Sequence, residues 1–133
     1  MGGAALWSRP VMVVEDDPTI GELLTLRLDL AGYRPTWVRD GAQALERINE
    51  VKPDLIVLDL GLPKVDGFQV LEALRAEPLW RDLPIIVLTA RHNSEDVRKA
   101  LSLGASDYMA KPFDAKRLQQ RIERQLALAP VKR

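Results

Sequence analysis

Short apolar runs alternate with longer amphipathic stretches along this 133-residue chain. Runs without polar alternation, such as Leu55–Leu58, are typical of strands that are buried on both faces. Strands of this kind belong to parallel sheets, and parallel neighbours need crossover connections that are usually helical. We therefore expect an α/β domain in which helices cover both faces of one parallel sheet. The strand-like runs are Val11–Val14, Tyr33–Val38, Leu55–Leu58, Ile85–Leu88 and Tyr108–Ala110.

The stretches between these runs carry the start and stop signals of helices. Asp17 followed by Pro18 is typical of an N-cap and a first helical residue, and Gly32 is placed to end that helix. Pro35 lies inside the second apolar run and favours an edge position for that strand, because proline donates no ladder hydrogen bond. The other predicted helices are Asp40–Glu50, Phe68–Ala76, a helix capped by Ser94 that reaches Leu103, and a helix capped by Asp114 that includes Leu118, Ile122 and Leu126.

Composition excludes several classes of protein. A hydrophobic content of 47% fits one globular domain, and the balance of 19 basic against 19 acidic residues gives no electrostatic case for binding nucleic acid or an anionic membrane. The chain has no cysteine for disulfides or thiolate chemistry. No apolar run approaches the roughly 20 residues of a membrane span. We expect a cytoplasmic protein with a flexible tail over residues 1–9, a domain over 10–128, and a tail or the start of a linker over 129–133.

Polar side chains follow four of the predicted strands, at the point where each strand ends. Glu15 and Asp16 follow the first strand, Asp59 the third, Thr89 the fourth and Lys111 the fifth. In a parallel α/β sheet, ligands bind beyond the carboxyl ends of the strands. We therefore expect these side chains to converge on one site.

The chemistry of this set favours metal-assisted phosphoryl transfer. Three carboxylates forced together repel one another, and a bound cation relieves the repulsion. Carboxylate and carbonyl oxygens are hard ligands that suit Mg²⁺. Lys111 and Thr89 would supply an ammonium and a hydroxyl to the oxygens of a transferring phosphoryl group. Asp59 is the best candidate for the nucleophile, because its strand is expected at the centre of the sheet.

Four motifs together resemble the bacterial two-component response-regulator receiver domain, the CheY-like family. They are VVEDDP (13–18), DLIVLDLGLPKVDG (54–67), PIIVLTA (84–90) and GASDYMAKPF (104–113). The resemblance covers the chain from about Pro10 to Leu126. It implies a doubly wound (βα)₅ flavodoxin-like sandwich with strand order 2-1-3-4-5.

The resemblance also implies a role for each residue of the predicted site. Asp59 corresponds to the phosphorylated aspartate of the family. Asp16 corresponds to a direct ligand of Mg²⁺, for which Mn²⁺ is a possible substitute. Glu15 would act on the metal through water, and Gly61 would bind it through its backbone carbonyl. The acceptor would assist its own phosphorylation and dephosphorylation, but it would not be a turnover enzyme.

The same resemblance implies a conformational switch. Thr89 corresponds to the switch hydroxyl, Tyr108 to the switch aromatic residue, and Lys111 to the lysine that contacts the phosphoryl group. Lys111 and Pro112 correspond to a cis peptide of the family. Phosphorylation would change the surface around the fourth helix, the fifth strand and the fifth helix.

The phosphoryl donor implied is a sensor histidine kinase or a histidine phosphotransfer protein. We expect Thr19, Ile20 and Pro112 to contact this donor, because they lie beside the predicted site. Gly61 and Arg91 would flank the route of the water that attacks the phosphorylated aspartate.

The downstream partner is not predicted. Receivers of the DNA-binding branch often pair through a charged face on the last two helices. Here Ser106 precedes Asp107 where two acids are usual, and Arg117 stands where an acid is common. We therefore expect a monomer or a weak phosphorylation-dependent dimer. The basic last helix is interpreted as a solvated face, so direct DNA binding by this domain is not expected.

Several alternatives stay open. A stand-alone receiver or phosphorelay shuttle is favoured over a receiver cut from a longer DNA-binding or enzymatic regulator. A flavin-binding electron carrier of the same topology would need a glycine- and hydroxyl-rich phosphate cradle where this chain has Glu15, Asp16 and Asp17. An aspartyl phosphohydrolase would usually place a second acid where Gly61 stands.

Overall fold

A parallel sheet forms the middle layer of the protein. The computed structural model describes residues 8–91 and 93–129. Its five strands are parallel and lie in the order β2-β1-β3-β4-β5, which confirms the predicted fold and strand order. The strands are β1 (Pro10–Val14), β2 (Arg34–Val38), β3 (Leu55–Leu58), β4 (Ile85–Thr89) and β5 (Asp107–Ala110). The strand that contains Pro35 lies at an edge, as predicted.

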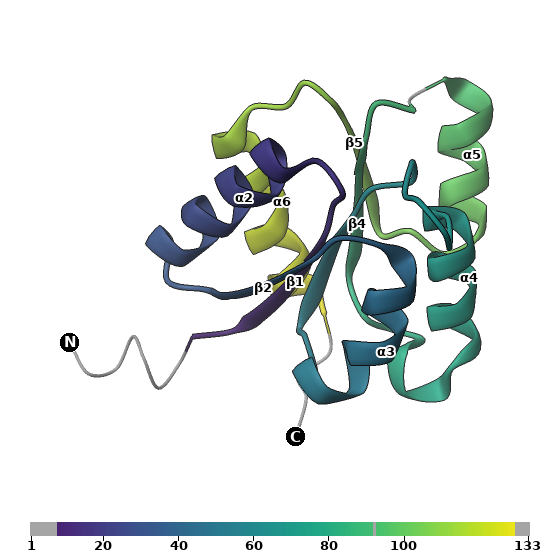
Figure 1. The fold of residues 1–133 in the computed structure, drawn as a ribbon, viewed down its shortest axis with the longest axis horizontal. Coiled ribbons are helices and arrows are strands. Elements are labelled where there is room, and N and C mark those ends of the chain that lie inside the picture. Colours follow the sequence, from purple (N-terminus) through teal and green to yellow (C-terminus); the bar gives the residue numbers. More distant parts are fainter. Residues whose placement is uncertain (1–7, 92, 130–133) are drawn as a thin grey trace.

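Helices cover both faces of this sheet. Figure 1 shows α2 and α6 on one face and α3, α4 and α5 on the other. The helices are α2 (Pro18–Leu30), α3 (Gly41–Val51), α4 (Gly67–Ala76), α5 (Ser94–Ser102) and α6 (Ala115–Leu128), with a short 3-10 helix η1 (Pro78–Trp80). The described elements are therefore the two helical layers and the central sheet of a doubly wound α/β domain.

The central strand β3 is buried along its whole length. Ile56 and Leu58 pack into the core beneath α3, α4 and α5, and Leu55 and Val57 pack into the core beneath α2 and α6. Burying one such side chain contributes about 1.5–3 kcal/mol. Packing on both faces holds β3 in place, and it therefore fixes the position of Asp59, which follows directly.

Three predicted helix starts were wrong by one residue. Ser94 does not cap α5: the cap is Asn93, whose side-chain oxygen accepts the N–H of Asp96 at 2.8 Å, and Ser94 is the first helical residue. This error arises because Ser and Asn both suit a cap, and the observed hydrogen bond decides between them.

The other two errors concern α3 and α4. Asp40 is the cap of α3 and not its first residue, because its carboxylate accepts the N–H of Gln43. Helix α4 begins at Gly67, directly after its cap Asp66, and not at Phe68. Asp17 and Asp114 cap α2 and α6 as predicted.

Trp80 lies in a helical turn that was not predicted from the sequence. It ends η1, is only 3% exposed, and its indole N–H donates to the side chain of Asn49 in α3 at 3.0 Å. A single turn has too few residues to show a helical period, so the sequence pattern could not reveal it.

The predicted tails largely fall on residues 1–7 and 130–133, which lie outside the described residues, so the domain limits stay predictions. The described elements run from Pro10 to Leu128. No helix within residues 8–91 and 93–129 is both long and apolar enough to cross a bilayer.

Gly67 lets the start of α4 approach the end of β3. Its N–H donates to the carbonyl of Leu60 at 3.0 Å. A Cβ at this position would overlap the backbone of Asp59 and Leu60. Because backbone cannot rotate out of the way as a side chain can, a larger residue here must separate α4 from the loop that follows Asp59.

We expect Gly67→Ala to lower the free energy of unfolding by about 1–3 kcal/mol, the usual cost of overpacking. Urea denaturation followed by circular dichroism measures this change. The matched control is Gly61→Ala, because a Cβ on Gly61 has nothing within 4 Å. The control should stay within about 0.5 kcal/mol of the unchanged protein. Equal effects of the two changes would contradict the close approach at Gly67.

Candidate functional site

The ends of β1 and β3 bring the predicted acids together. Oxygen atoms of Glu15, Asp16 and Asp59 lie within 4.8 Å of one another. Glu15 and Asp59 are buried, at 2% and 7% exposure, whereas Asp16 is half-buried at the rim. Like charges this close repel strongly when little water screens them. The predicted convergence of the three carboxylates is therefore present.

Lys111 reaches this cluster from the end of β5. Its ammonium donates to Glu15 Oε1 at 2.6 Å and to Asp59 Oδ2 at 3.3 Å. Burial by itself would lower the pKa of Lys111, but the hydrogen bonds and negative charges of Glu15 and Asp59 outweigh it and raise that pKa. Lys111 is therefore held in its charged form and bridges two of the acids.

The charge on Glu15 is only partly stabilised. Burial raises the pKa of this carboxyl group, while hydrogen bonds from Lys111 and from the N–H of Asp17 oppose the rise. The negative charge of Asp59 raises it further. One ammonium thus leaves an excess of negative charge among the three carboxylates.

The donor set suits a hard divalent cation. Every side-chain ligand that Glu15, Asp16 and Asp59 offer is a carboxylate oxygen. The carboxylate of Asp16 has no hydrogen-bond donor among the described residues and so can turn to a ligand. Oxygen donors at a partly hydrated rim fit Mg²⁺, which keeps several of its waters. These residues could therefore hold such an ion and offset their excess charge.

Asp59 is fixed by its main chain and by both carboxylate oxygens. Its N–H donates to the carbonyl of Val14 in β1 at 3.0 Å, and its Oδ1 accepts the N–H of Gly61 at 3.2 Å. Its Oδ2 faces Lys111. The hydrogen bond to the N–H of Gly61 closes a tight turn directly after β3. The residue whose carbonyl was predicted to bind metal therefore lies beside the carboxylate of Asp59.

Thr89 and Tyr108 lie on the two neighbouring strands β4 and β5. Thr89 is 1% exposed, and its hydroxyl oxygen accepts the N–H of Arg91 at 3.2 Å. The hydroxyl of Tyr108 is buried without a hydrogen-bond partner among the described residues, and burial raises the pKa of Tyr108. The peptide between Lys111 and Pro112 is cis, as the family resemblance implied.

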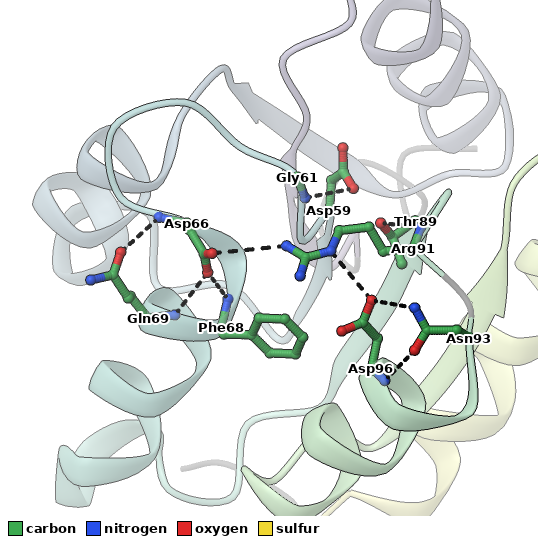
Figure 2. A network of polar contacts seen from close by, with 9 residues as sticks. All are labelled: Asp59, Gly61, Asp66, Phe68, Gln69, Thr89, Arg91, Asn93 and Asp96. Atoms are coloured by element: carbon green, nitrogen blue, oxygen red, sulfur yellow. Dashed lines mark hydrogen bonds and ion pairs between the residues drawn. The ribbon is translucent and has the colours of Figure 1, made fainter.

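Arg91 forms ion pairs with acids at the N-terminal ends of two helices, as Figure 2 shows. Its guanidinium lies 3.4 Å from a carboxylate oxygen of Asp96 in α5 and 3.9 Å from one of Asp66, the cap of α4. It also lies over the ring of Phe68, 5.1 Å from the centroid, and Lys99 lies 4.3 Å from the same ring. Arg91 was predicted only to flank the route of water, and no sequence pattern indicated these partners.

Sequence reasoning also missed the support of the acidic pair from β2. The indole N–H of Trp37 donates to the carbonyl of Glu15, and the guanidinium of Arg39 donates to the carbonyl of Asp16. Trp37 was assigned no function. The available indication was the strand order, since the end of β2 lies beside the end of β1 where the acids are.

Comparisons with known proteins agree with this geometry. A family model described as the response regulator receiver domain matches residues 11–123. The DNA-binding response regulator MtrA of Mycolicibacterium smegmatis is 41% identical over 116 residues, which cover 87% of this chain and 50% of MtrA. The chain spans about half the length of the curated relatives it matches.

Solved receiver domains of histidine kinases share the fold. The one from Syntrophus aciditrophicus has a TM-score of 0.86 and 32% identity, covering 94% of this chain and 96% of its own. The one from Pseudomonas aeruginosa PAO1 has a TM-score of 0.83 and 35% identity, covering 90% of this chain and 98% of its own. That second structure is described with a magnesium ion coordinated in its active site cleft.

We expect Asp16→Asn to stabilise the metal-free protein. The change removes one repelling charge and keeps the shape of the side chain, so the free energy of unfolding in EDTA at neutral pH and low salt should rise by about 0.5–1.5 kcal/mol. Urea denaturation measures it. Mg²⁺ at 100 times its Kd should then add about 2.7 kcal/mol to the unchanged protein and much less to the variant.

Glu72→Gln is the control for this experiment, because Glu72 is an exposed acid on α4. It should leave both the stability in EDTA and the gain from Mg²⁺ unchanged. A loss of stability in EDTA for Asp16→Asn would show that Asp16 stabilises the metal-free fold and would contradict the repulsion argument.

Proposed function

Because the chain belongs to the response regulator receiver domain family, we propose that Asp59 accepts a phosphoryl group from a sensor histidine kinase or a histidine phosphotransfer protein. The observation that carries the proposal is the bridge of Lys111 between Glu15 and Asp59 beside the carboxylate of Asp16. This arrangement combines a nucleophile, a cation-binding cluster and a positive charge at one end of the sheet. Those are the parts that phosphoryl transfer needs.

In the proposed reaction, an oxygen of the Asp59 carboxylate attacks the phosphorus of a phosphohistidine. The new O–P bond forms as the N–P bond breaks, and the bond electrons leave with the imidazole of the donor. The ammonium of Lys111 and the hydroxyl of Thr89 stabilise the negative oxygens of the phosphoryl group. The product is an acyl phosphate that water later hydrolyses.

Mg²⁺, or Mn²⁺ in its place, would neutralise charge on the phosphoryl oxygens. Asp16, Asp59 and the carbonyl of Gly61 would hold it directly, and Glu15 would act through water. The magnesium ion described in the similar receiver from Pseudomonas aeruginosa supports this choice of cation. The excess of carboxylates over ammonium groups in this cluster supports it independently.

The same proposal assigns the conformational response to Thr89 and Tyr108. Thr89 would exchange the N–H of Arg91 for a phosphoryl oxygen, and Tyr108 would follow into the space that opens. The hydroxyl of Tyr108 is buried and has no hydrogen-bond partner within the described part of the chain, which supports a movable side chain, since an unsatisfied polar group favours any position where it finds a partner. The affected surface would be that of α5, β5 and α6.

The phosphodonor is proposed to dock on the outer face of α2. Thr19 and Ile20 begin this face beside the acidic pair, and Pro112 follows Lys111. Exposed leucines continue it along the helix at three- and four-residue spacing: Leu23, Leu26 and Leu30, exposed by 43%, 56% and 75%. Exposed leucines in a row on a helix surface are typical of a site that a partner covers.

The output of the switch has two candidates. The expectation of a stand-alone receiver or phosphorelay shuttle stays a prediction. The alternative, a receiver within a longer DNA-binding regulator, is favoured by the curated relatives, which are named as DNA-binding or transcriptional regulators and have about twice the matched length. The complete reading frame of the gene decides between them.

A monomer or weak dimer is proposed for this domain. Asp107, the acid of the expected pairing face, already forms an ion pair with Arg121 of α6, in which one guanidinium nitrogen lies 2.8 and 2.9 Å from the two carboxylate oxygens. The neighbouring Ser106 accepts the N–H of Ile85 and adds no charge. Few acids are thus free to pair with a second copy on this face.

Acetyl phosphate with Mg²⁺ should phosphorylate this protein on Asp59. We expect a phosphoryl mass shift in intact-protein mass spectrometry, its loss in EDTA, and its absence in Asp59→Asn. The control is Asp54→Asn, an acid at the opposite end of β3 that pairs with Arg9 at 3.0 Å. A phosphoryl mass shift of undiminished size in Asp59→Asn would identify another residue as the acceptor.

Substitutions on the outer face of α2 test docking of the phosphodonor separately from phosphoryl transfer to Asp59. Ile20→Glu and Leu23→Glu should slow phosphotransfer at least about ten-fold from a phosphorylated histidine kinase that serves the unchanged protein, because each buries a charge against an apolar partner. Phosphorylation by acetyl phosphate should be unaffected. Leu79→Glu is the control, since Leu79 is equally apolar and 67% exposed at the other end of the molecule. Equal transfer rates to all three variants would refute the docking face.

A further inference from the structure

The main chain that carries the acidic pair is held by two side chains, one from the edge strand β2 and one from the residue that directly follows it. The indole N–H of Trp37 donates to the carbonyl of Glu15 at 2.8 Å, and the guanidinium of Arg39 donates to the carbonyl of Asp16 at 3.2 Å. Arg39 also lies over the indole, 5.5 Å from the ring centroid. Both carbonyls of the pair are thus bound at the point where the regular sheet ladder stops.

The hydrogen bonds on either side complete this support. The carbonyl of Val14 accepts the N–H of Asp59, and the N–H of Glu15 donates to the carbonyl of Val38. Asp17, the next residue after the pair, caps α2. Since both carbonyls of the pair and the N–H of Glu15 have partners outside the loop, those partners help to set the path of the pair.

Gly21 provides the space in which Trp37 lies. Gly21 is buried on α2, and a Cβ added to it would overlap the indole ring of Trp37. The indole is therefore seated directly against the helix backbone, with its N–H directed at Glu15. Trp37 and Gly21 form a matched pair, because a larger residue at 21 would displace the ring from this seat.

The support matters because the acids repel one another. The carboxylate of Asp16 has no hydrogen-bond donor among the described residues, so only its main chain holds it near Glu15 and Asp59. Repulsion favours movement of the loop outward, away from the shared cation position. A hydrogen bond that fixes the loop lowers the cost of assembling the ligands when the cation binds.

We propose that Trp37 is a positioning residue for the cation site: its indole N–H fixes the carbonyl of Glu15 and so keeps Asp16 directed at the ion. The inference rests on the proposed metal-dependent function. Trp37 touches neither the ion nor the phosphoryl group in this arrangement and acts through the main chain.

The test is the affinity for Mn²⁺ alone, read from the electron paramagnetic resonance signal of the free ion, with Mg²⁺ as competitor. Trp37→Phe keeps most of the ring and removes the N–H. Losing one hydrogen bond of ordinary strength should raise the Kd about three- to ten-fold. Gly21→Ala keeps the indole but displaces it, so it should also raise the Kd. Alanine has a higher helix propensity than glycine, so this rise would not come from a weaker helix α2.

Trp80→Phe is the matched control, because the indole N–H of Trp80 also donates a hydrogen bond, to the side chain of Asn49 in α3, and neither residue belongs to the acidic cluster. Its Kd should change less than about two-fold, even where urea denaturation shows a loss of stability. An equal loss of affinity in Trp37→Phe and Trp80→Phe would overturn the inference, because general destabilisation would then explain both.

The remaining outcomes separate the inference from its premise. If the unchanged protein left the Mn²⁺ signal unaltered, the proposed metal site and this inference would both fall. If it bound Mn²⁺ and Trp37→Phe bound as tightly, only the role of Trp37 would fall. Should Trp37→Phe fail to fold, Gly21→Ala decides, and an unchanged Kd in that variant would overturn the inference.

Discussion

Electrostatic repulsion at one end of the sheet is the constraint on which the rest of the structure depends. Glu15, Asp16 and Asp59 share a small volume, and Lys111 offsets only part of their charge. A fold selected for stability alone would not gather these acids, because like charges in a poorly screened setting cost free energy. Their close approach is what a cation-dependent phosphoryl acceptor needs, so the proposed function explains a feature that stability does not.

Packing and hydrogen bonds around the acids hold their backbone in place against this repulsion. The apolar β3 is packed on both faces and leaves Asp59 no freedom of backbone. Gly67 brings the start of α4 against the loop after β3, and Trp37 and Arg39 hold the loop after β1. The opposite side of the site is less constrained, since Arg91 is exposed and is held by ion pairs of 3.4 and 3.9 Å to half-buried acids. We infer that the acids are fixed while the switch side keeps room to move.

Most of the fold could be predicted from the sequence, because its determinants are local. Unbroken apolar runs such as Leu55–Leu58 reveal buried strands, and Asp17 before Pro18 reveals a helix start. The prediction failed where neighbours were equally suitable, as at Asn93 and Ser94, or where a single turn had no period, as in η1. The contacts of Trp37 and Arg91 were not predicted, since the partners of each are set by strand order and helix placement rather than by sequence spacing.

The sequence by itself determined the architecture and the composition of the site. The periods of its apolar residues require a parallel sheet between helices, and the carboxyl ends of such strands must meet, so Glu15, Asp16, Asp59, Thr89 and Lys111 had to gather. Only the tertiary structure decided how they are held: Lys111 between Glu15 and Asp59, Trp37 on the carbonyl of Glu15, and Arg91 between α4 and α5. The physical reason is the distance along the chain over which each kind of interaction acts. Backbone preferences and hydrophobic periods act over a few residues, whereas hydrogen bonds and ion pairs between distant segments depend on side-chain positions that exist only once the layers have packed.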